Sequence, residues 1–242
     1  MSIYILDTET TDKKDGEVIE LAYRKLFYEE TYAYYEQAEE YFHSYFVSTS
    51  PIAYGAMATH HILRSDIEGK PLYTPDKLPN DLTYLVGHNI KFDWEAIGKP
   101  NCRLIDTLVL ARQAWPNVDS YTQSALMYYL SDDKEKTRAK LVHAHSAIAD
   151  IGFCFEILQS AVDVLLTKGI DTSPEGLWRY CEEMKIPIIM PVGKHKGIPI
   201  IDLPIDYVEW FLRQPDVEEN LKLALLDRKY PGTIGKYLEQ LA

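Results

Sequence analysis

Two acidic side chains, Asp7 and Glu9, stand one residue apart directly after the short apolar run at residues 3–6. In an extended chain, residues i and i+2 point to the same face, so these two carboxylates would lie side by side where the predicted strand ends. Adjacent carboxylates repel each other unless a positive charge lies between them, and Mg²⁺ and Mn²⁺ both favour oxygen ligands. A polar turn that closes a hairpin would explain the same residues, so this stretch alone leaves both interpretations open.

Three further residues could contribute to the same chemistry. Asp93 closes the segment Gly87–Asp93, which follows a predicted strand, and His145 and Asp150 lie five residues apart near the start of a long apolar-periodic segment. If His145 precedes the helix and Asp150 lies in its first turns, both side chains can face one site. His145 alone would be read as a surface histidine at a helix start.

These residues resemble, in order, the three exonuclease motifs of the DnaQ-like family: Asp7-x-Glu9, then Gly87–Asp93, then His145 with Asp150. The histidine placed before the last aspartate is typical of the DEDDh branch, which takes its name from four carboxylates. The motifs span residues 7–150. Further segments, at 56–60, 110–116 and 191–197, resemble one member of the family that carries a small C-terminal module.

The resemblance implies a ribonuclease H-like fold and a site for two divalent metal ions, Mg²⁺ or Mn²⁺. It implies four metal ligands, namely Asp7, Glu9, Asp93 and Asp150. Asp7 would bridge both ions, Glu9 and Asp150 would complete one site, and Asp93 would hold the other ion largely through water. His145 would take the proton from the attacking water, and its unperturbed pKa of about 6.5 suits that role near neutral pH.

Residues that would contact the substrate are expected around the same site. Thr10, Ala56 and Met57 would line the terminal nucleotide, with His60 near its sugar or phosphate, since apolar side chains can stack on a base without reading it. Met57 could instead belong to the core. Asn89 could position the substrate or cap the next helix. The basic loop at 194–196 could contact phosphate or form a solvated turn.

The expected activity is 3′–5′ hydrolysis of DNA, which releases nucleoside 5′-monophosphates and serves DNA repair. The expected partner is therefore a nucleic acid 3′ end, with DNA favoured and RNA possible. A 3′–5′ exoribonuclease would use the same chemistry. A catalytically idle nucleic-acid-binding module would have lost a carboxylate or His145, and all five residues are present. Strandedness, pathway and oligomeric state stay open.

The elements that must position these residues are predicted from hydrophobic periodicity. Strands are expected at residues 2–6, 18–27, 41–47, 82–86 and 103–105, and the first three should be antiparallel because no helix separates them. Helices are expected at 92–98, 106–114, 121–130 and 143–167, and further along from 174, at 206–214 and at 220–228. Residues 28–40 are expected to form a turn or irregular hairpin and residues 131–140 an exposed charged loop. This order predicts an α/β fold with a mixed five-stranded sheet and helices on both faces, in a catalytic domain at 1–169. A small helical C-terminal module would occupy 170–242.

Composition sets broad limits on the class of protein. The chain has 242 residues and a formal net charge of −12, which argues against a large basic surface that grips nucleic acid. No apolar run approaches the ~20 residues that a membrane helix needs, and no basic segment followed by an apolar one suggests a signal peptide. Three widely spaced cysteines indicate neither a disulfide framework nor a zinc site. A cytoplasmic location without membrane contact is therefore expected.

Overall fold

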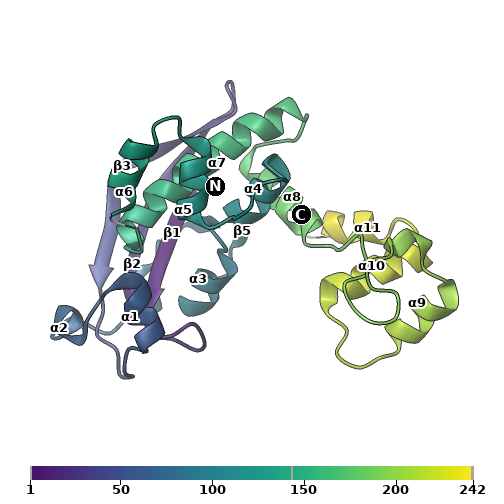
Figure 1. Cartoon of the computed structure of the whole chain (residues 1–242), viewed down its shortest axis with the longest axis horizontal. Coiled ribbons are helices and arrows are strands. Elements are labelled where there is room, and N and C mark those ends of the chain that lie inside the picture. The colour runs from purple at the N-terminus through teal and green to yellow at the C-terminus, as the bar shows by residue number, and fades with distance from the viewer. Residues whose placement is uncertain (1, 143, 241–242) are drawn as a thin grey trace. The chain divides into compact units, whose positions relative to one another are not determined.

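The computed structural model describes residues 2–142 and 144–240, and it contains one five-stranded sheet with helices around it (Figure 1). The strands are β1 (Ser2–Thr10), β2 (Val18–Glu29), β3 (Tyr34–Tyr45), β4 (Leu82–Gly87) and β5 (Arg103–Asp106). The helices are α1 (Tyr54–His60), α2 (Arg64–Ile67), α3 (Lys91–Ala96), α4 (Thr107–Ala114), α5 (Gln123–Leu130), α6 (Lys134–Leu141), α7 (Ala147–Thr167), α8 (Pro174–Met184), α9 (Ile205–Leu212), α10 (Glu219–Lys229) and α11 (Thr233–Gln240).

The strand order is β3-β2-β1-β4-β5, and the sheet is mixed as predicted. Strands β1, β2 and β3 pair antiparallel, whereas β4 pairs parallel with both β1 and β5. Because β1, β4 and β5 run in the same direction, their carboxyl ends meet at one edge of the sheet. Residues at those strand ends can therefore converge on one site.

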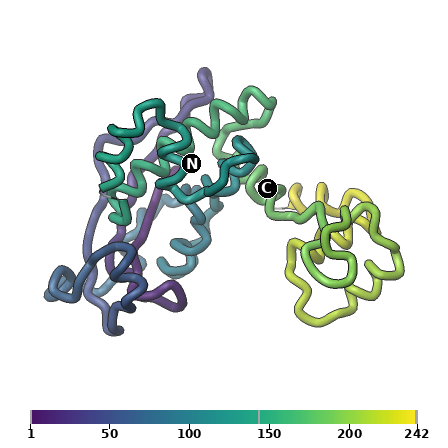
Figure 2. The backbone as a smooth tube through the Cα atoms, in the orientation of Figure 1, coloured from purple at the N-terminus to yellow at the C-terminus, as the bar shows by residue number. Residues whose placement is uncertain are grey.

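Both faces of the central strand are covered, which explains its apolar sequence. Tyr4 and Leu6 pack on one face in a core cluster with Ile90 and Ile97, which flank α3. Helix α7 contacts β1, β2 and β3, and lies along them in Figures 1 and 2. Helices α4 and α5 contact α7 in turn. Helix α7 therefore places its side chains directly against the sheet.

Some predicted boundaries were wrong. Strand β1 continues through Thr10, so Asp7 and Glu9 lie in the strand and not after it. Strand β3 begins at Tyr34, inside the segment predicted as a turn or irregular hairpin and ahead of the strand start predicted at residue 41, because aromatic residues there pair across the hairpin; the rings of Tyr28 and Tyr35 lie 5.0 Å apart. The predicted start of the long helix, residue 143, lies outside the described residues.

The segment predicted as an exposed charged loop at 131–140 contains a helix, α6. The Asp133 side chain caps this helix by accepting a hydrogen bond from the Lys136 backbone N–H. Lys140 joins the helix to α7 through an ion pair of 2.8 Å with Glu156. Because the segment is highly charged, its sequence did not predict this helix, which a side-chain cap and an ion pair stabilise.

The chain divides into two compact units, Met1–Trp178 and Arg179–Ala242. The second unit has its own core, in which Met190, Leu203, Val208 and Leu225 are fully buried. The division lies inside α8, further along the chain than the boundary predicted at residue 170. Residues beyond 170 remain with the first unit because the Tyr35 hydroxyl donates to the Thr172 carbonyl.

Among residues 2–142 and 144–240, the structure has no helix that combines the length and the apolar character needed to cross a membrane.

Candidate active site

The site is built at the end of β1, where the alternation of the strand places Asp7 and Glu9 on one face. Across the antiparallel pair, Asp7 lies opposite Ala22 and Glu9 lies opposite Glu20. A β-bulge follows Glu9 and ends this register. The bulge and the strand end leave both carboxylates half-buried and open to a ligand.

Helix α3 supplies Asp93, which is buried. Its Oδ1 accepts hydrogen bonds from the Thr8 backbone N–H at 2.9 Å and from the Thr8 hydroxyl at 2.7 Å. These bonds fix the carboxylate against the middle of the Asp7-x-Glu9 motif. The helix can approach because Gly87 precedes it; a Cβ at that position would lie 2.4 Å from Ile90 Cδ1.

Helix α7 supplies Asp150, and the turn before it supplies His145. Ligand atoms of Glu9, His145 and Asp150 all lie within 4.8 Å of one another. Asp150 is buried, whereas the His145 side chain is exposed. His145 has a φ of 65°, a left-handed conformation that is uncommon outside glycine. The structure thus brings together residues that are far apart in the sequence.

Burial and mutual repulsion raise the pKa values of all four carboxylates. The pKa of Asp7 lies well above its usual value because of burial and the charges of Asp93, Asp150 and Glu9. The pKa of Glu9 is raised to about 9, mainly by burial and by Asp150. Burial raises the pKa values of Asp93 and Asp150 to about 7, although hydrogen bonds from Thr8 and from the His145 backbone oppose the rise.

The donor set fits divalent cations. Among the described residues, no lysine or arginine forms an ion pair with any of these four carboxylates. Like charges that are buried together without a counter-ion are costly, and a hard divalent cation with oxygen ligands removes that cost. Glu9 and Asp150 face one position together with His145, while Asp7 and Asp93 are coupled to them electrostatically.

The residues expected to contact the substrate divide into two groups. Thr10 and His60 are buried, and His60 Nδ1 accepts a hydrogen bond from the Ile62 backbone N–H. Ala56 and Met57 are partly exposed on α1, and Met57 lines a shallow apolar pocket. Substrate contact by these four residues remains a prediction, and the two on α1 are the more accessible.

Asn89 is exposed and has a φ of 61°, a conformation that asparagine tolerates well. Its backbone N–H donates to Asp106, and its carbonyl accepts from Phe92. The residue at the N-terminal cap of α3 is Ile90, without a side-chain cap bond. The alternative that the Asn89 side chain caps this helix is therefore wrong, and its substrate contact remains a prediction.

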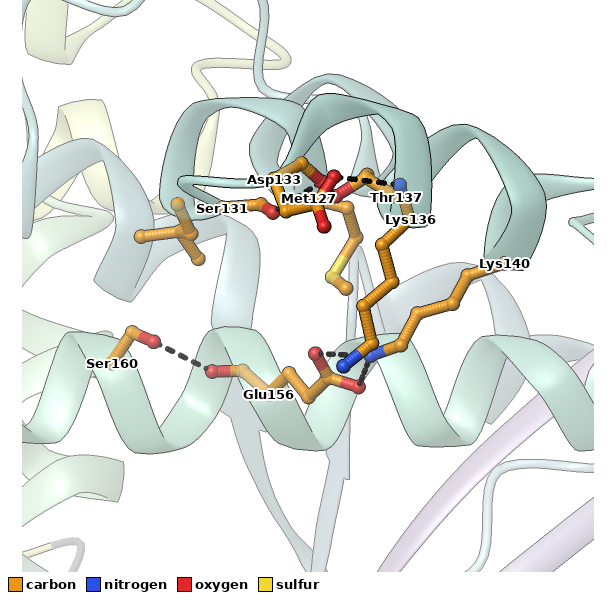
Figure 3. Close-up of a pocket in the computed structure, with 9 residues that line it drawn as sticks. Met127, Ser131, Asp133, Lys136, Thr137, Lys140, Glu156 and Ser160 are labelled. Atoms are coloured by element: carbon orange, nitrogen blue, oxygen red, sulfur yellow. Dashed lines mark hydrogen bonds and ion pairs between the residues drawn. The ribbon is translucent and has the colours of Figure 1, made fainter.

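A pocket of about 270 Å³ is lined by Thr10 and Phe92 and by charged side chains of both signs, namely Lys13, Lys99, Asp12, Asp15 and Glu95; none of the four carboxylates of the site lines it. A second pocket, of about 290 Å³, lies between α5, α6 and α7 and is lined by Lys136, Lys140 and Glu156 among others (Figure 3). It contains none of the residues of the carboxylate site. Lys140 is paired with Glu156 there, so it is engaged in the fold (Figure 3).

Sequence reasoning missed one charged residue at the site, Glu20 on β2. It is fully buried, and its charge contributes to the raised pKa values of Asp7, Glu9 and Asp150. The available signal was an acidic residue in the middle of an apolar strand, between Ile19 and Leu21.

A mixed five-stranded sheet with acidic residues gathered at the end of its first strand defines the ribonuclease H-like class of α/β folds. The structure matches a solved structure of this kind, "Exonuclease X in complex with 5′ overhanging duplex DNA", with a TM-score of 0.52 and 24% sequence identity. The match covers 74% of this chain and 99% of that chain. The predicted fold class is confirmed.

In sequence, the chain is homologous to exodeoxyribonuclease 10 of Escherichia coli K12, at 25% identity over 181 residues. The match covers 72% of this chain and 78% of that protein, and the same values hold for the protein of Escherichia coli O6:H1. This is the enzyme, also called exonuclease X, that residues 56–60, 110–116 and 191–197 resemble, so the recognised resemblance is confirmed. A family described as "Putative quorum-sensing-regulated virulence factor" matches residues 184–220.

Proposed function

We propose that this protein is a metal-dependent 3′–5′ exodeoxyribonuclease that releases nucleoside 5′-monophosphates from DNA 3′ ends. The observation that carries the proposal is the cluster of Asp7, Glu9, Asp93 and Asp150 with His145 beside it. The relatives named as exonucleases, one of them in complex with duplex DNA, support both the activity and the polymer. A cytoplasmic role in DNA repair is part of the proposal.

Each residue has a role that its environment suits. Asp7, Glu9, Asp93 and Asp150 would hold two divalent ions, Mg²⁺ or Mn²⁺. Bound there, such ions supply charge neutralisation at the scissile phosphate and at the leaving oxygen. The exposed His145 would accept the proton of the attacking water at an imidazole nitrogen. Thr8 holds Asp93 in place through two hydrogen bonds to Oδ1.

The terminal nucleotide would lie beside the end of β1. Ala56 and Met57 of α1 would contact it through apolar surface, without reading the base. Thr10 and His60 would support these contact residues from inside the protein, because both are buried.

The test is digestion of 5′-labelled DNA oligonucleotides with Mg²⁺ or Mn²⁺, with EDTA as the control. Stepwise shortening from the 3′ end is expected, and Asp7→Asn should abolish it. A product ladder that survives Asp7→Asn would refute the proposed site, and no shortening of any substrate would refute the activity.

Matched DNA and RNA oligonucleotides of one sequence would decide the polymer. Faster digestion of DNA supports the proposal, whereas a preference for RNA identifies the exoribonuclease alternative. Titration with Mn²⁺ separates both from an idle nucleic-acid-binding module, because such a module should bind no pair of metal ions.

A further inference from the structure

Glu20 carries a carboxylate with no exposure to solvent, in the middle of β2. The residue lies directly opposite Glu9 in the β1–β2 ladder, on the face of the sheet that α7 covers. A buried carboxylate is costly unless donors surround it. The hydrogen-bond donors around the Glu20 carboxylate therefore indicate its role.

Those donors come from two other elements. The ring nitrogen Nε2 of His43, on β3, lies 2.7 Å from Glu20 Oε1. The Ser146 hydroxyl donates to the same oxygen at 3.3 Å, and the Ala147 backbone N–H donates to Oε2 at 3.3 Å. Both of the latter donors belong to the start of α7.

Helix α7 begins without a cap of its own. Ser146 is the N-terminal cap residue, and its side chain makes no cap bond. The first N–H groups of a helix have no partner inside the helix, and a carboxylate near them is favourable. Glu20 supplies that partner from the sheet, so a residue 127 positions away caps α7.

The capped residues directly follow His145. The His145 side chain is exposed and its backbone is left-handed, so packing of the ring does not fix its position. A non-glycine residue in this conformation costs on the order of 1 kcal/mol or more, and the surrounding structure must hold it. The His145 backbone N–H bonds Asp150 on one side, and Glu20 holds residues 146 and 147 on the other.

We propose that Glu20 is a positioning residue that holds His145 at the metal site by anchoring the two residues after it, with His43 orienting the Glu20 carboxylate. This inference rests on the proposed function, because it assigns the support of the proposed general base. Glu20 itself touches neither substrate nor metal in this role. It acts only through the backbone at the start of α7.

The test compares Glu20→Ala with Glu20→Gln in the full-length protein. Displacing a catalytic group by about 1 Å costs about 10²-fold in rate, so Glu20→Ala should lower kcat about 10²-fold and leave KM nearly unchanged. Glutamine keeps an oxygen for the Ala147 N–H, so Glu20→Gln should restore kcat to within about threefold of the original. If both variants lose activity equally, charge and not position is responsible, and the proposal is overturned.

Glu175→Ala is the matched control. Glu175 is a partly buried carboxylate of the same unit that pairs with Arg103 and bonds the Tyr84 hydroxyl, away from the metal-binding edge. Its loss should lower thermal stability without changing kcat. If Glu20→Ala behaves in the same way, with kcat unchanged, Glu20 is only structural and the proposal is wrong.

Hydrogen exchange tests the anchor without reference to activity. Loss of one hydrogen bond of about 1 kcal/mol should speed exchange of the Ala147 amide about fivefold in Glu20→Ala, while amides in the middle of α7 stay protected. Unchanged Ala147 exchange overturns the proposal. Absence of any metal-dependent shortening by the unaltered protein refutes the proposed function instead, and the exchange result still decides whether Glu20 anchors the turn.

Discussion

At the scale of single residues, the site joins groups that destabilise one another. Asp7, Glu9 and Asp150 are held close by the strand and the helix that carry them; Asp150 raises the pKa values of Asp7 and Glu9, and Glu9 also raises that of Asp7. Such an arrangement is typical of a functional site, where a ligand of opposite charge offsets the repulsion between the carboxylates. The histidine next to them is exposed, as a group that exchanges protons with water must be.

Replacement of His145 by alanine should lower kcat by about 10²–10⁴-fold, the usual contribution of a general base. Mn²⁺ binding should persist, because the four carboxylates remain. Steady-state hydrolysis of a labelled oligonucleotide and calorimetric Mn²⁺ titration measure the two effects. Unchanged kcat would exclude His145 as the base.

Stability should depend on pH in a direction set by the raised pKa values. Glu9 ionises near 4.5 in an unfolded chain and near 9 in the folded protein, so the folded state binds more protons across this range. The free energy of unfolding of the metal-free protein should therefore fall as pH rises from about 5 to about 9. Thermal unfolding in EDTA measures this decline.

Divalent cations should reverse that decline. Mg²⁺ binds the ionised carboxylates of the folded state, so the rise in Tm on its addition should be larger at pH 9 than at pH 6. Asp7→Asn, which removes one charge from the cluster, should flatten the dependence. An equal Mg²⁺ effect at both pH values would contradict the assignment of these carboxylates as ligands.

The five main site residues could be predicted because motif spacing survives without knowledge of the fold. Glu20 could not, since its alternation within β2 resembles that of a residue facing solvent. Only the register with Glu9 and the arrival of α7 reveal that both faces of β2 are buried there. The substrate contact of His60 was expected from a local pattern that does not report burial.

At the scale of elements, Asp106 links the site to the helix behind it. Its Oδ1 accepts from the Leu108 N–H as the cap of α4, as predicted, and also from the Asn89 N–H, which holds the turn before α3. One carboxylate oxygen thus fixes the start of α4 and the loop that leads to Asp93. Loss of this residue should affect both.

Asp106→Ala should lower the free energy of unfolding by about 2–3 kcal/mol, because a cap and a second hydrogen bond disappear together. Asp133→Ala is the matched control, since Asp133 caps α6 through the Lys136 N–H on an exposed surface. That control should cost about 1 kcal/mol. Urea denaturation measures both values, and equal losses would mean that the Asn89 bond contributes nothing.

The strands and the long helix were predicted well, because their periodicity reflects burial. The predicted start of β3 was wrong, and so was the prediction of a loop where α6 lies. Residues 34–40 are polar and aromatic, yet pairing with β2 makes them a strand. Five of the eight residues 134–141 are charged, yet a cap and one ion pair to α7 keep the segment helical. Both segments depend on partners that a local pattern does not contain.

At the scale of the whole molecule, the first unit ends inside α8 and includes the first five residues of that helix, Pro174–Trp178. The Trp178 ring lies under the Arg103 guanidinium, 4.2 Å from its carbon, and the Tyr84 hydroxyl donates to Glu175 at 2.7 Å. These contacts bind the start of α8 to β4 and β5. A fragment that ends at the predicted boundary would lack them.

A fragment of residues 1–184 should therefore unfold at a higher temperature than a fragment of residues 1–169. The shorter fragment lacks three contacts, which Thr172, Glu175 and Trp178 make with the first unit. At about 1 kcal/mol each, their loss should lower Tm by roughly 5–10 °C for a unit of this size. Calorimetry of the two fragments, with the full-length chain as reference, measures the difference. Equal Tm values would show that residues 170–178 do not stabilise the first unit.

The long sequence separation between Glu20 and α7 has a consequence for synthesis of the chain. The anchor of His145 joins Glu20 to the Ala147 N–H, and these two residues are 127 positions apart in the chain. The proposed base can take its place only after β2, β3 and α7 have all docked. If the protein is the proposed nuclease, a chain whose synthesis has not reached α7 would carry three of the proposed ligands without a positioned base, and nearby nucleic acid would be spared until folding is complete.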